Sequence, residues 1–337
     1  MRYAMLVKPH ANVRYRQSLQ KLALIELQCL LAAWGLEAEP QLTGIQGEPF
    51  LVFDTEYMTE ECWRALSRHS AICFAAELRD RALVPLRRDR GEYLPDDLSQ
   101  VLKYKGKTNA DFTMMMLHCA KAASDFARSD APLCVLDPLC GKATTLFCAM
   151  QEGDNAVGVE LNAKALAETD AYFERFLKMH RLKHRRESGS QTMAGGGSAR
   201  RITYTLADTP ENMKQGDTRT LSLINGDATR LNSLLRQESC HLLVSDLPYG
   251  VQHAPREGKG ISSLQKLVGA LLRSCMPVLK RGGVVALAFN ANTLRRPEVA
   301  RAMREAGLSV LEDRPYNDFS HWVEQAVERD VIVARKA

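Results

Sequence analysis

The residues best suited to chemistry gather at one turn, Asp246-Leu247-Pro248-Tyr249, which follows an apolar run that begins at Leu242. The Asp246 carboxylate and the Leu247 carbonyl can both accept hydrogen bonds from an amino group. Pro248 fixes its own φ and stiffens the turn, and Tyr249 offers a ring face on which a planar base can stack. An ordinary surface turn could have the same composition, because Asp and Pro are common turn residues. The combination predicts a site that aligns an exocyclic amine for attack, and alignment can supply ~7 to 11 kcal/mol.

Three more acidic residues end apolar, strand-like runs ahead of that turn: Asp137, Glu160 and Asp227. Ligands of open α/β sheets bind at the carboxyl ends of the strands. The turn after Asp137 passes through Gly141, which would let a ligand approach the backbone, and the next helix could bind a carboxylate with its free N–H groups. Glu160 could bind a ribose diol with its two oxygens, and Asp227 could accept from an adenine amino group. Taken alone, each aspartate is better explained as a helix cap.

Taken together, these strand ends suit S-adenosylmethionine, with its methionine, ribose and adenine parts meeting the three acids in chain order. The pattern differs from a nicotinamide dinucleotide site, because the spacing G-x-G-x-x-G does not follow the first strand. Nine cysteines, an odd number without a Cys-x-x-Cys pair, favour free thiols, so no metal site is expected. The expected cofactor contacts at these turns are Asp137, Leu139, Gly141, Glu160, Leu161, Asp227, Ala228 and Asp246.

These acids lie in a region where short apolar strands alternate with helical patterns. Such alternation is typical of a parallel, doubly wound sheet with helices on both faces, so we expect an α/β, Rossmann-like domain over residues 111–337. The segment 187–220 interrupts it and is expected to be a flexible surface insertion, because it is rich in Gly, Ser and Thr and is a poor core former. The expected strands are 133–136, 156–159, 221–224, 242–244, 284–289 and 331–334.

Residues 1–87 follow a different order. Strand-like runs at 3–7, 38–42, 49–53 and 71–77 alternate with helical patterns at 18–34 and after Thr59. This β-α-β-β-α-β order predicts a smaller α+β domain of the ferredoxin-like kind. The polar stretch that follows predicts a linker, which we place at residues 88–110.

Basic residues gather in one part of a chain whose net charge is only +5. Residues 175–201 contain eight basic residues and a single acidic one, Glu187. A concentrated basic segment on a near-neutral body is expected of a protein that binds a polyanion, although a solvated helix end has the same composition. His253 and Arg256 follow the Asp246 turn and could face a nucleotide or be an exposed loop pair. The predicted nucleic-acid contacts are Lys105, Lys107, Arg181, Lys183, Arg185, Arg186, His253 and Arg256.

The composition is that of an ordinary globular protein, with 45% hydrophobic and 25% charged residues. No apolar run approaches the ~20 residues that span a bilayer. Residues 1–8 lack the features of a secretory signal. We therefore expect a cytoplasmic protein without membrane contact.

The turn Asp246-Leu247-Pro248-Tyr249 resembles the (Asn/Asp/Ser)-x-Pro-(Tyr/Phe) motif of class I amino methyltransferases. With Lys105-Gly106-Lys107-Thr108-Asn109 and Phe112-Thr113, the chain is similar to the RNA guanine-N2 methyltransferases, which have a UPF0020-like RNA methylase domain and commonly carry THUMP domains. The resemblance covers about residues 101–336 and includes Arg329-Asp330-Val331-Ile332-Val333 near the end.

This resemblance implies a class I methyltransferase domain that uses S-adenosylmethionine to methylate the amino group of guanine in tRNA or rRNA. It also implies that Phe112 and Thr113 lie against the methionine end of the cofactor. The chain departs from the family in two ways. Leu247 occupies the place of a second proline in many relatives, and the N-terminal hundred residues have no room for a complete THUMP domain beside a ferredoxin-like one. Some relatives need a small activating subunit, which is a candidate partner here, and the sequence leaves the oligomeric state open.

Two other functions fit the same residues. A DNA adenine-N6 methyltransferase shares the Asp246 motif, because an amino group on a planar base poses the same problem. A nucleic-acid-binding module that has lost catalysis would keep the fold, but it would not need Asp137, Glu160 and Asp246 together. Nucleoside analysis of a methylated product tests the first alternative, and calorimetry of cofactor binding tests the second.

Overall fold

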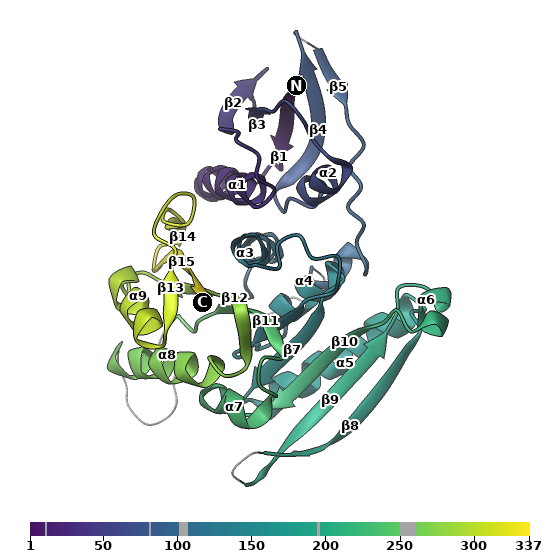
Figure 1. Cartoon of the computed structure of the whole chain (residues 1–337), viewed down its shortest axis with the longest axis vertical. Helices are drawn as coiled ribbons and strands as arrows, with labels where there is room; N and C mark the ends of the chain where they lie inside the picture. Colours follow the sequence, from purple (N-terminus) through teal and green to yellow (C-terminus); the bar gives the residue numbers. More distant parts are fainter. Residues whose placement is uncertain (11, 81, 101–106, 194–195, 250–260) are drawn as a thin grey trace.

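The computed structural model describes residues 1–337 apart from 11, 81, 101–106, 194–195 and 250–260, and the described residues form two sheets (Figure 1). A five-stranded sheet comes from the N-terminal part and a ten-stranded sheet from the remainder. The smaller sheet lies at one end of the molecule in Figure 1, and helix α1 lies between it and helix α3 of the second domain.

The N-terminal sheet has the strand and helix order that the sequence predicts. All neighbouring strands are antiparallel, in the order β2-β3-β1-β4-β5. Side chains alternate along each strand, so Tyr3, Met5 and Val7 pack against the two helices while Leu6 lies on the opposite face. The last strand, β5, is not predicted by the sequence. The elements are β1 (Arg2–Val7), α1 (Val13–Ala33), β2 (Gln41–Ile45), β3 (Glu48–Asp54), α2 (Glu60–Ser67), β4 (Ile72–Arg79) and β5 (Ala82–Pro85).

The larger sheet contains all six strands that the sequence predicts for the second domain. Five of them run parallel: β6 (Cys134–Asp137), β7 (Asn155–Glu160), β10 (Arg219–Asn225), β11 (Cys240–Asp246) and β12 (Leu279–Asn290). The sixth, β15 (Val327–Lys336), is antiparallel to β12. The expectation of a purely parallel sheet is therefore wrong at residues 331–334. A strand buried on both faces has no side-chain pattern that reveals its direction.

The strand order of this sheet is β13-β15-β12-β11-β6-β7-β10-β9-β8. Two short strands, β13 (Leu308–Val310) and β14 (His321–Glu324), both pair with β15. The parallel strands therefore occupy the middle of the sheet, and antiparallel strands extend it on both sides.

Helices cover both faces of this sheet, which gives the Rossmann-like arrangement that the sequence predicts. Side chains from α3 (Ala110–Ala123), α4 (Thr144–Gln151) and α5 (Ala163–Met179) form one core with strand residues such as Val135 and Leu242. The next residues along the same strands, Leu136 and Leu243, join the opposite core. That core includes α7 (Leu231–Leu234), α8 (Ile261–Cys275) and α9 (Arg296–Glu305).

Most of the described residues between 187 and 220 form regular structure, which differs from the flexible surface insertion that the sequence predicts. They contain most of β8 (His184–Thr192), all of β9 (Ser198–Leu206) and α6 (Pro210–Gln215), and the start of β10. Along β9, Ile202, Tyr204 and Leu206 alternate and are buried, and the Tyr204 ring meets the Phe173 ring of α5 at 5.0 Å. The glycines and serines of the segment hide this two-residue period in the overall composition.

The stretch expected to be a linker contacts both domains over its described residues. Arg88 donates to the Ser67 and Ile72 carbonyls of the N-terminal domain, and the residues from Tyr93 onward pack on the second domain. Leu94 and Leu98 are buried in its core, the latter in the short helix η1 (Asp96–Leu98). The Tyr93 N–H donates to the Gln151 carbonyl at 2.8 Å. These contacts attach the start of the second domain to the end of α4.

Candidate active site

The acidic residues singled out in the sequence lie at one edge of the ten-stranded sheet. Asp137, Glu160 and Asp246 are the last residues of β6, β7 and β11, and Asp227 comes two residues after β10 ends. These strands are neighbours in the order β11-β6-β7-β10, and they are parallel, so their carboxyl ends lie on the same side. The structure therefore brings the four acids to the edge where ligands of open α/β sheets bind.

Asp137 is buried and is held by its own neighbours. Its Oδ1 accepts hydrogen bonds from Ser245 Oγ at 2.7 Å and from the Leu139 N–H at 3.1 Å. Burial raises the pKa of Asp137 to about 6, although hydrogen bonds from Ser245 and Thr145 act in the opposite direction. Helix α4 follows this turn and begins after Ala143 without a side-chain cap. A helix start of this kind can bind a ligand carboxylate.

Glu160 links the first two turns of the site. Its Oε2 accepts from the Gly141 N–H at 2.9 Å, and its Oε1 accepts from the Asn162 N–H at 2.8 Å. Each carboxylate oxygen has a second lone pair, so Glu160 can still accept from a diol. Gly141 has a φ of +50°, and a Cβ added there would meet no atom within 4 Å, so open space lies beside this turn. Leu161, next to Glu160, is 70% exposed.

Asp227 acts as a helix cap, which is the alternative that the sequence left open. Its Oδ1 accepts from the backbone N–H and from Oγ1 of Thr229, both at 2.8 Å, at the start of helix η2 (Ala228–Arg230). Ala228 is buried and Asp227 is exposed. Because only one carboxylate oxygen makes the cap, the other can face a ligand.

Two hydroxyl groups fix the Asp246 carboxylate. Thr108 Oγ1 donates to Asp246 Oδ2 at 2.5 Å, and the Tyr249 hydroxyl donates to Asp246 Oδ1 at 2.5 Å. The Leu247 N–H donates to the Ala288 carbonyl at 2.9 Å, which ties the turn to β12. Burial raises the pKa of Asp246, while Arg329 and the two hydroxyl groups lower it.

Two residues that local sequence patterns do not connect to the Asp246 turn, Thr108 and Arg329, also belong to the site. Arg329 Nε donates to the Tyr249 hydroxyl, and its guanidinium carbon lies 4.4 Å from the centroid of the Phe112 ring and 5.2 Å from that of the Tyr249 ring. Tyr249 thus contributes its hydroxyl group, and the stacking of a base on its ring stays a prediction. Thr108 and Arg329 both lie in segments that carry the family resemblance, which is the one sequence signal for them.

Phe112 and Thr113 lie in the first turn of α3, which Asn109 caps by accepting from the Asp111 and Phe112 N–H groups. Both are buried, and the Thr113 hydroxyl donates to the Asn109 carbonyl at 3.1 Å. Because Phe112 contacts Arg329, the start of α3 reaches the Asp246 turn, as the predicted site requires.

The predicted nucleic-acid contacts fall into three groups. Arg181, Lys183 and Arg185 are exposed around the start of β8. Arg186 and Lys107 are already engaged, because Arg186 pairs with Asp170 at 2.7 Å and Lys107 Nζ donates to the Ser99 carbonyl at 2.5 Å. Lys105, His253 and Arg256 lie outside the described residues.

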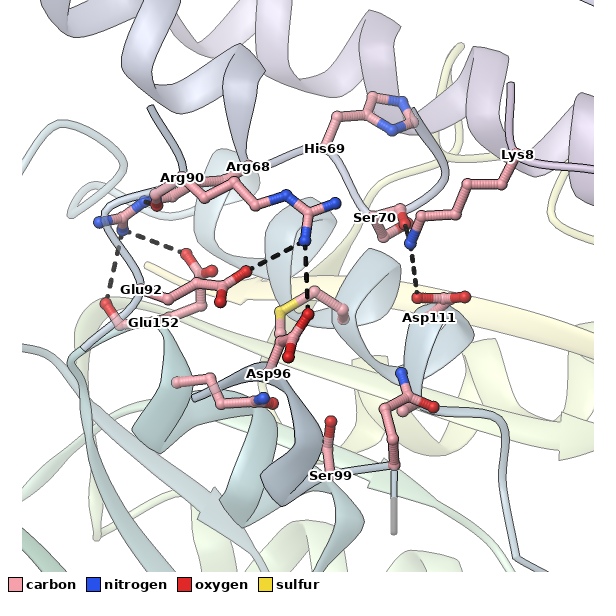
Figure 2. Close-up of a pocket in the computed structure, with 14 residues that line it drawn as sticks. Lys8, Arg68, His69, Ser70, Arg90, Glu92, Asp96, Ser99, Asp111 and Glu152 are labelled. Atoms are coloured by element: carbon pink, nitrogen blue, oxygen red, sulfur yellow. Dashed lines mark hydrogen bonds and ion pairs between the residues drawn. The ribbon is translucent and has the colours of Figure 1, made fainter. Parts of the chain in front are cut away.

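A separate cavity lies between the N-terminal domain and the second domain (Figure 2). Each cation that lines it is paired. Lys8 lies 3.0 Å from Asp111, Arg68 lies 3.2 Å from Glu152, and Arg90 lies 3.3 Å from Glu92. The Lys8 and Arg68 pairs make the cavity part of a domain interface, and none of the cations among its described lining residues is left unpaired for a ligand.

Within the described residues, no group of three or more His, Cys, Asp or Glu side chains could hold a metal ion. The nine cysteines are all free thiols. No helix in the described part of the chain is both long and apolar enough to cross a membrane.

Residues 113–314 match the family model UPF0020, described as RMKL-like, methyltransferase domain. Among solved structures, the chain is similar to a TehB-like SAM-dependent methyltransferase from Corynebacterium glutamicum, with 13% identity, a TM-score of 0.39, and 69% of this chain and 90% of that chain covered. It is also similar to a methyltransferase homolog protein from Pyrococcus horikoshii, with 12% identity, a TM-score of 0.39, and coverage of 100% and 86%. No curated protein matches the sequence.

Proposed function

Because the chain belongs to the RMKL-like methyltransferase domain family, we propose that it methylates the exocyclic amino group of guanine in RNA, either tRNA or rRNA. The observation that carries this proposal is the Asp246 carboxylate, fixed by two hydroxyl groups at the end of β11 beside the Leu247 carbonyl. Two adjacent acceptors suit an amino group, which has two hydrogens to donate. The choice of guanine rests on the family resemblance of residues 105–109 and 246–249.

S-adenosylmethionine is the cofactor, and when bound it supplies an electrophilic methyl group on a sulfonium. The residues at the sheet edge fit it. The open space beside Gly141 and the uncapped start of α4 suit its methionine part, Glu160 suits its ribose, and the second oxygen of Asp227 suits its adenine. Phe112 and Thr113 would complete the pocket at the methionine end.

The chain's own groups hold the acceptor and take up its proton. Asp246 and the Leu247 carbonyl each accept a hydrogen bond from the amino group. These two bonds direct the nitrogen lone pair at the methyl carbon. With the cofactor bound as the methyl donor, the amino nitrogen would become acidic on methylation. Asp246 then receives the amino proton and releases it to solvent. Most of the rate gain comes from alignment.

The exposed basic residues Arg181, Lys183 and Arg185 support a polyanionic substrate, since basic side chains contact phosphates and position the strand. We also propose that the N-terminal domain is ferredoxin-like. Its strand order β2-β3-β1-β4 and the packing of both helices on one face of the sheet support this assignment.

The test is methyl transfer from labelled S-adenosylmethionine into RNA, followed by digestion to nucleosides and mass analysis. We expect N2-methylguanosine from the wild type and none from Asp246→Ala. Asp130→Ala is the matched control, because it removes an exposed carboxylate away from the sheet edge. Methyladenine in DNA with inert RNA would support the adenine-N6 alternative. Absence of cofactor binding by calorimetry would instead favour the inactive binding module.

A further inference from the structure

We propose that Arg329 is a positioning residue of the amino-methylation site, where it holds Tyr249 so that the hydroxyl groups of Tyr249 and Thr108 together fix the Asp246 carboxylate. This inference rests on the proposed function, because it concerns how the same site orients its acceptor. Arg329 lies 80 residues after Tyr249 in the sequence.

Arg329 reaches the site from β15. Its Cα pairs with that of Asn290, the last residue of β12, while Asp246 pairs with Ala288 on the other side of β12. The two residues therefore lie at the same edge of the sheet, with β12 between their strands. Arg329 is 5% exposed, and its guanidinium lies close to both the Phe112 ring and the Tyr249 ring.

The charge of Arg329 has no direct carboxylate partner among the described residues. The adjacent Asp330 pairs with Arg296 at 3.0 Å. A buried cation without a counter-ion is unfavourable, and contact with two aromatic faces offsets part of that cost. The remaining compensation comes from Asp246, which lies one hydrogen bond beyond Tyr249. Burial raises the pKa of Asp246, and the charge of Arg329 opposes that rise. The cation and the catalytic carboxylate thus stabilise each other through the tyrosine.

The direction of this hydrogen-bond chain is fixed. Arginine can only donate, so the Tyr249 oxygen must accept from Arg329 Nε and direct its own proton at Asp246 Oδ1. Thr108 occupies the other oxygen, Oδ2. Each carboxylate oxygen then has one lone pair used and one left for the substrate. Without Arg329, the tyrosine hydroxyl could rotate, and the carboxylate would lose both its fixed orientation and a stabilising charge.

The experiment compares Arg329→Gln and Arg329→Lys with Arg335→Gln. Arg335 is on the same strand, but it is exposed and pairs with Asp125 at 3.0 Å, so its loss controls for changes in β15. We would measure cofactor affinity by calorimetry and kcat and KM for RNA methylation over a range of pH. For Arg329→Gln we expect unchanged cofactor affinity. We also expect kcat to fall by up to ~100-fold, because misplacement of a reacting group by about 1 Å can cost that much. The acid limb of the pH dependence of kcat should move to higher pH.

Arg329→Lys keeps the charge but not the flat guanidinium. It should restore the acid limb toward that of the wild type while kcat stays reduced. A wild-type acid limb in Arg329→Gln, or an equal loss of kcat in Arg335→Gln, would overturn the inference and leave Arg329 with a purely structural role.

A second readout does not depend on the RNA substrate. The carbonyl stretch of protonated Asp246 can be identified in infrared spectra by its absence from Asp246→Asn and then titrated in the cofactor-bound protein. Arg329→Gln should protonate Asp246 at higher pH than the wild type, and identical titrations would refute the positioning role. If the wild type methylates no RNA, the proposed function fails while this titration still decides the role of Arg329.

Discussion

The substitution His118→Gln should weaken the docking of the N-terminal domain onto the second domain. His118 lies on α3, with Nδ1 2.6 Å from Oε1 of Glu26 on α1 and Nε2 3.5 Å from Oε2 of Glu152. All three side chains are buried. Glutamine cannot carry the positive charge, so the substitution would leave two buried carboxylates facing each other across a neutral group.

The magnitude follows from the charge of His118. Burial alone would lower its pKa, but Glu152 and Glu26 raise it from 6.5 to about 9. A rise of this size corresponds to about 3 kcal/mol in favour of the charged form in the folded protein. This agrees with the ~3 to 5 kcal/mol that breaking a buried ion pair usually costs. We therefore expect the free energy of unfolding to fall by about 3 kcal/mol in His118→Gln.

The pH dependence has a defined sign. The pKa of His118 is raised on folding, so its contribution is fully present below pH 6.5 and is lost as the pH rises through about 9. Burial would raise the pKa of Glu26 and of Glu152, but neighbouring groups outweigh it. His69 and His118 lower the pKa of Glu26 from 4.5 to about 2. His118 and Arg68 lower the pKa of Glu152 from 4.5 to about 2. The contribution of these two glutamates is present above pH 4.5 and is lost as the pH falls through about 2.

The assay is urea unfolding followed by circular dichroism, at one pH below 6.5 and one above 9. His184→Gln is the matched control, because His184 is partly buried on β8 and its Nδ1 hydrogen-bonds to the Leu182 carbonyl at 2.8 Å, with no carboxylate partner among the described residues. We expect His118→Gln to lose much of its stability relative to the wild type at the lower pH and much less at the higher pH. A difference from the wild type that is the same at both pH values would refute this expectation.

Three further predictions concern the sheet edge and the basic surface. In Gly158→Ala the added Cβ would lie 2.4 Å from the nearest side-chain atom, so stability should fall by about 1 to 3 kcal/mol in thermal unfolding. Gly189→Ala, where nothing lies within 4 Å of the added atom, should change it little. Burial raises the pKa of Asp137 from 3.8 to about 6. The free energy of unfolding of the wild type should therefore fall by about 3 kcal/mol as the pH rises between these values. Urea titrations of Asp137→Asn should not show this pH dependence. Replacing Lys183 and Arg185 together by Gln should make the logarithm of the RNA affinity less dependent on the logarithm of the salt concentration, by about two phosphate contacts. Fluorescence anisotropy measures this slope. An unchanged slope would show that the two residues lie outside the RNA interface.

The sequence predicted the features of this fold that depend on local patterns. Apolar runs located the central strands, and the acids at or just after their ends lie at one edge of the sheet, because both follow from the periodicity and topology of α/β sheets. It missed β8 and β9, since their alternation is masked by polar composition. It also could not pair Thr108 with Asp246 or Arg329 with Tyr249, which are 138 and 80 residues apart, because no local signal connects positions so distant in the chain.

Helix α3 connects the domain interface to the candidate active site. Asp111 and His118 are seven residues apart and so lie on the same face of the helix, where they pair with Lys8 and Glu26 of the N-terminal domain. Phe112, one residue after Asp111, points in another direction and contacts Arg329. The N-terminal domain therefore fixes the position of the helix start from which Phe112 reaches the Asp246 turn. Loosening this docking should disturb the Asp246 site without any change in the residues that surround it.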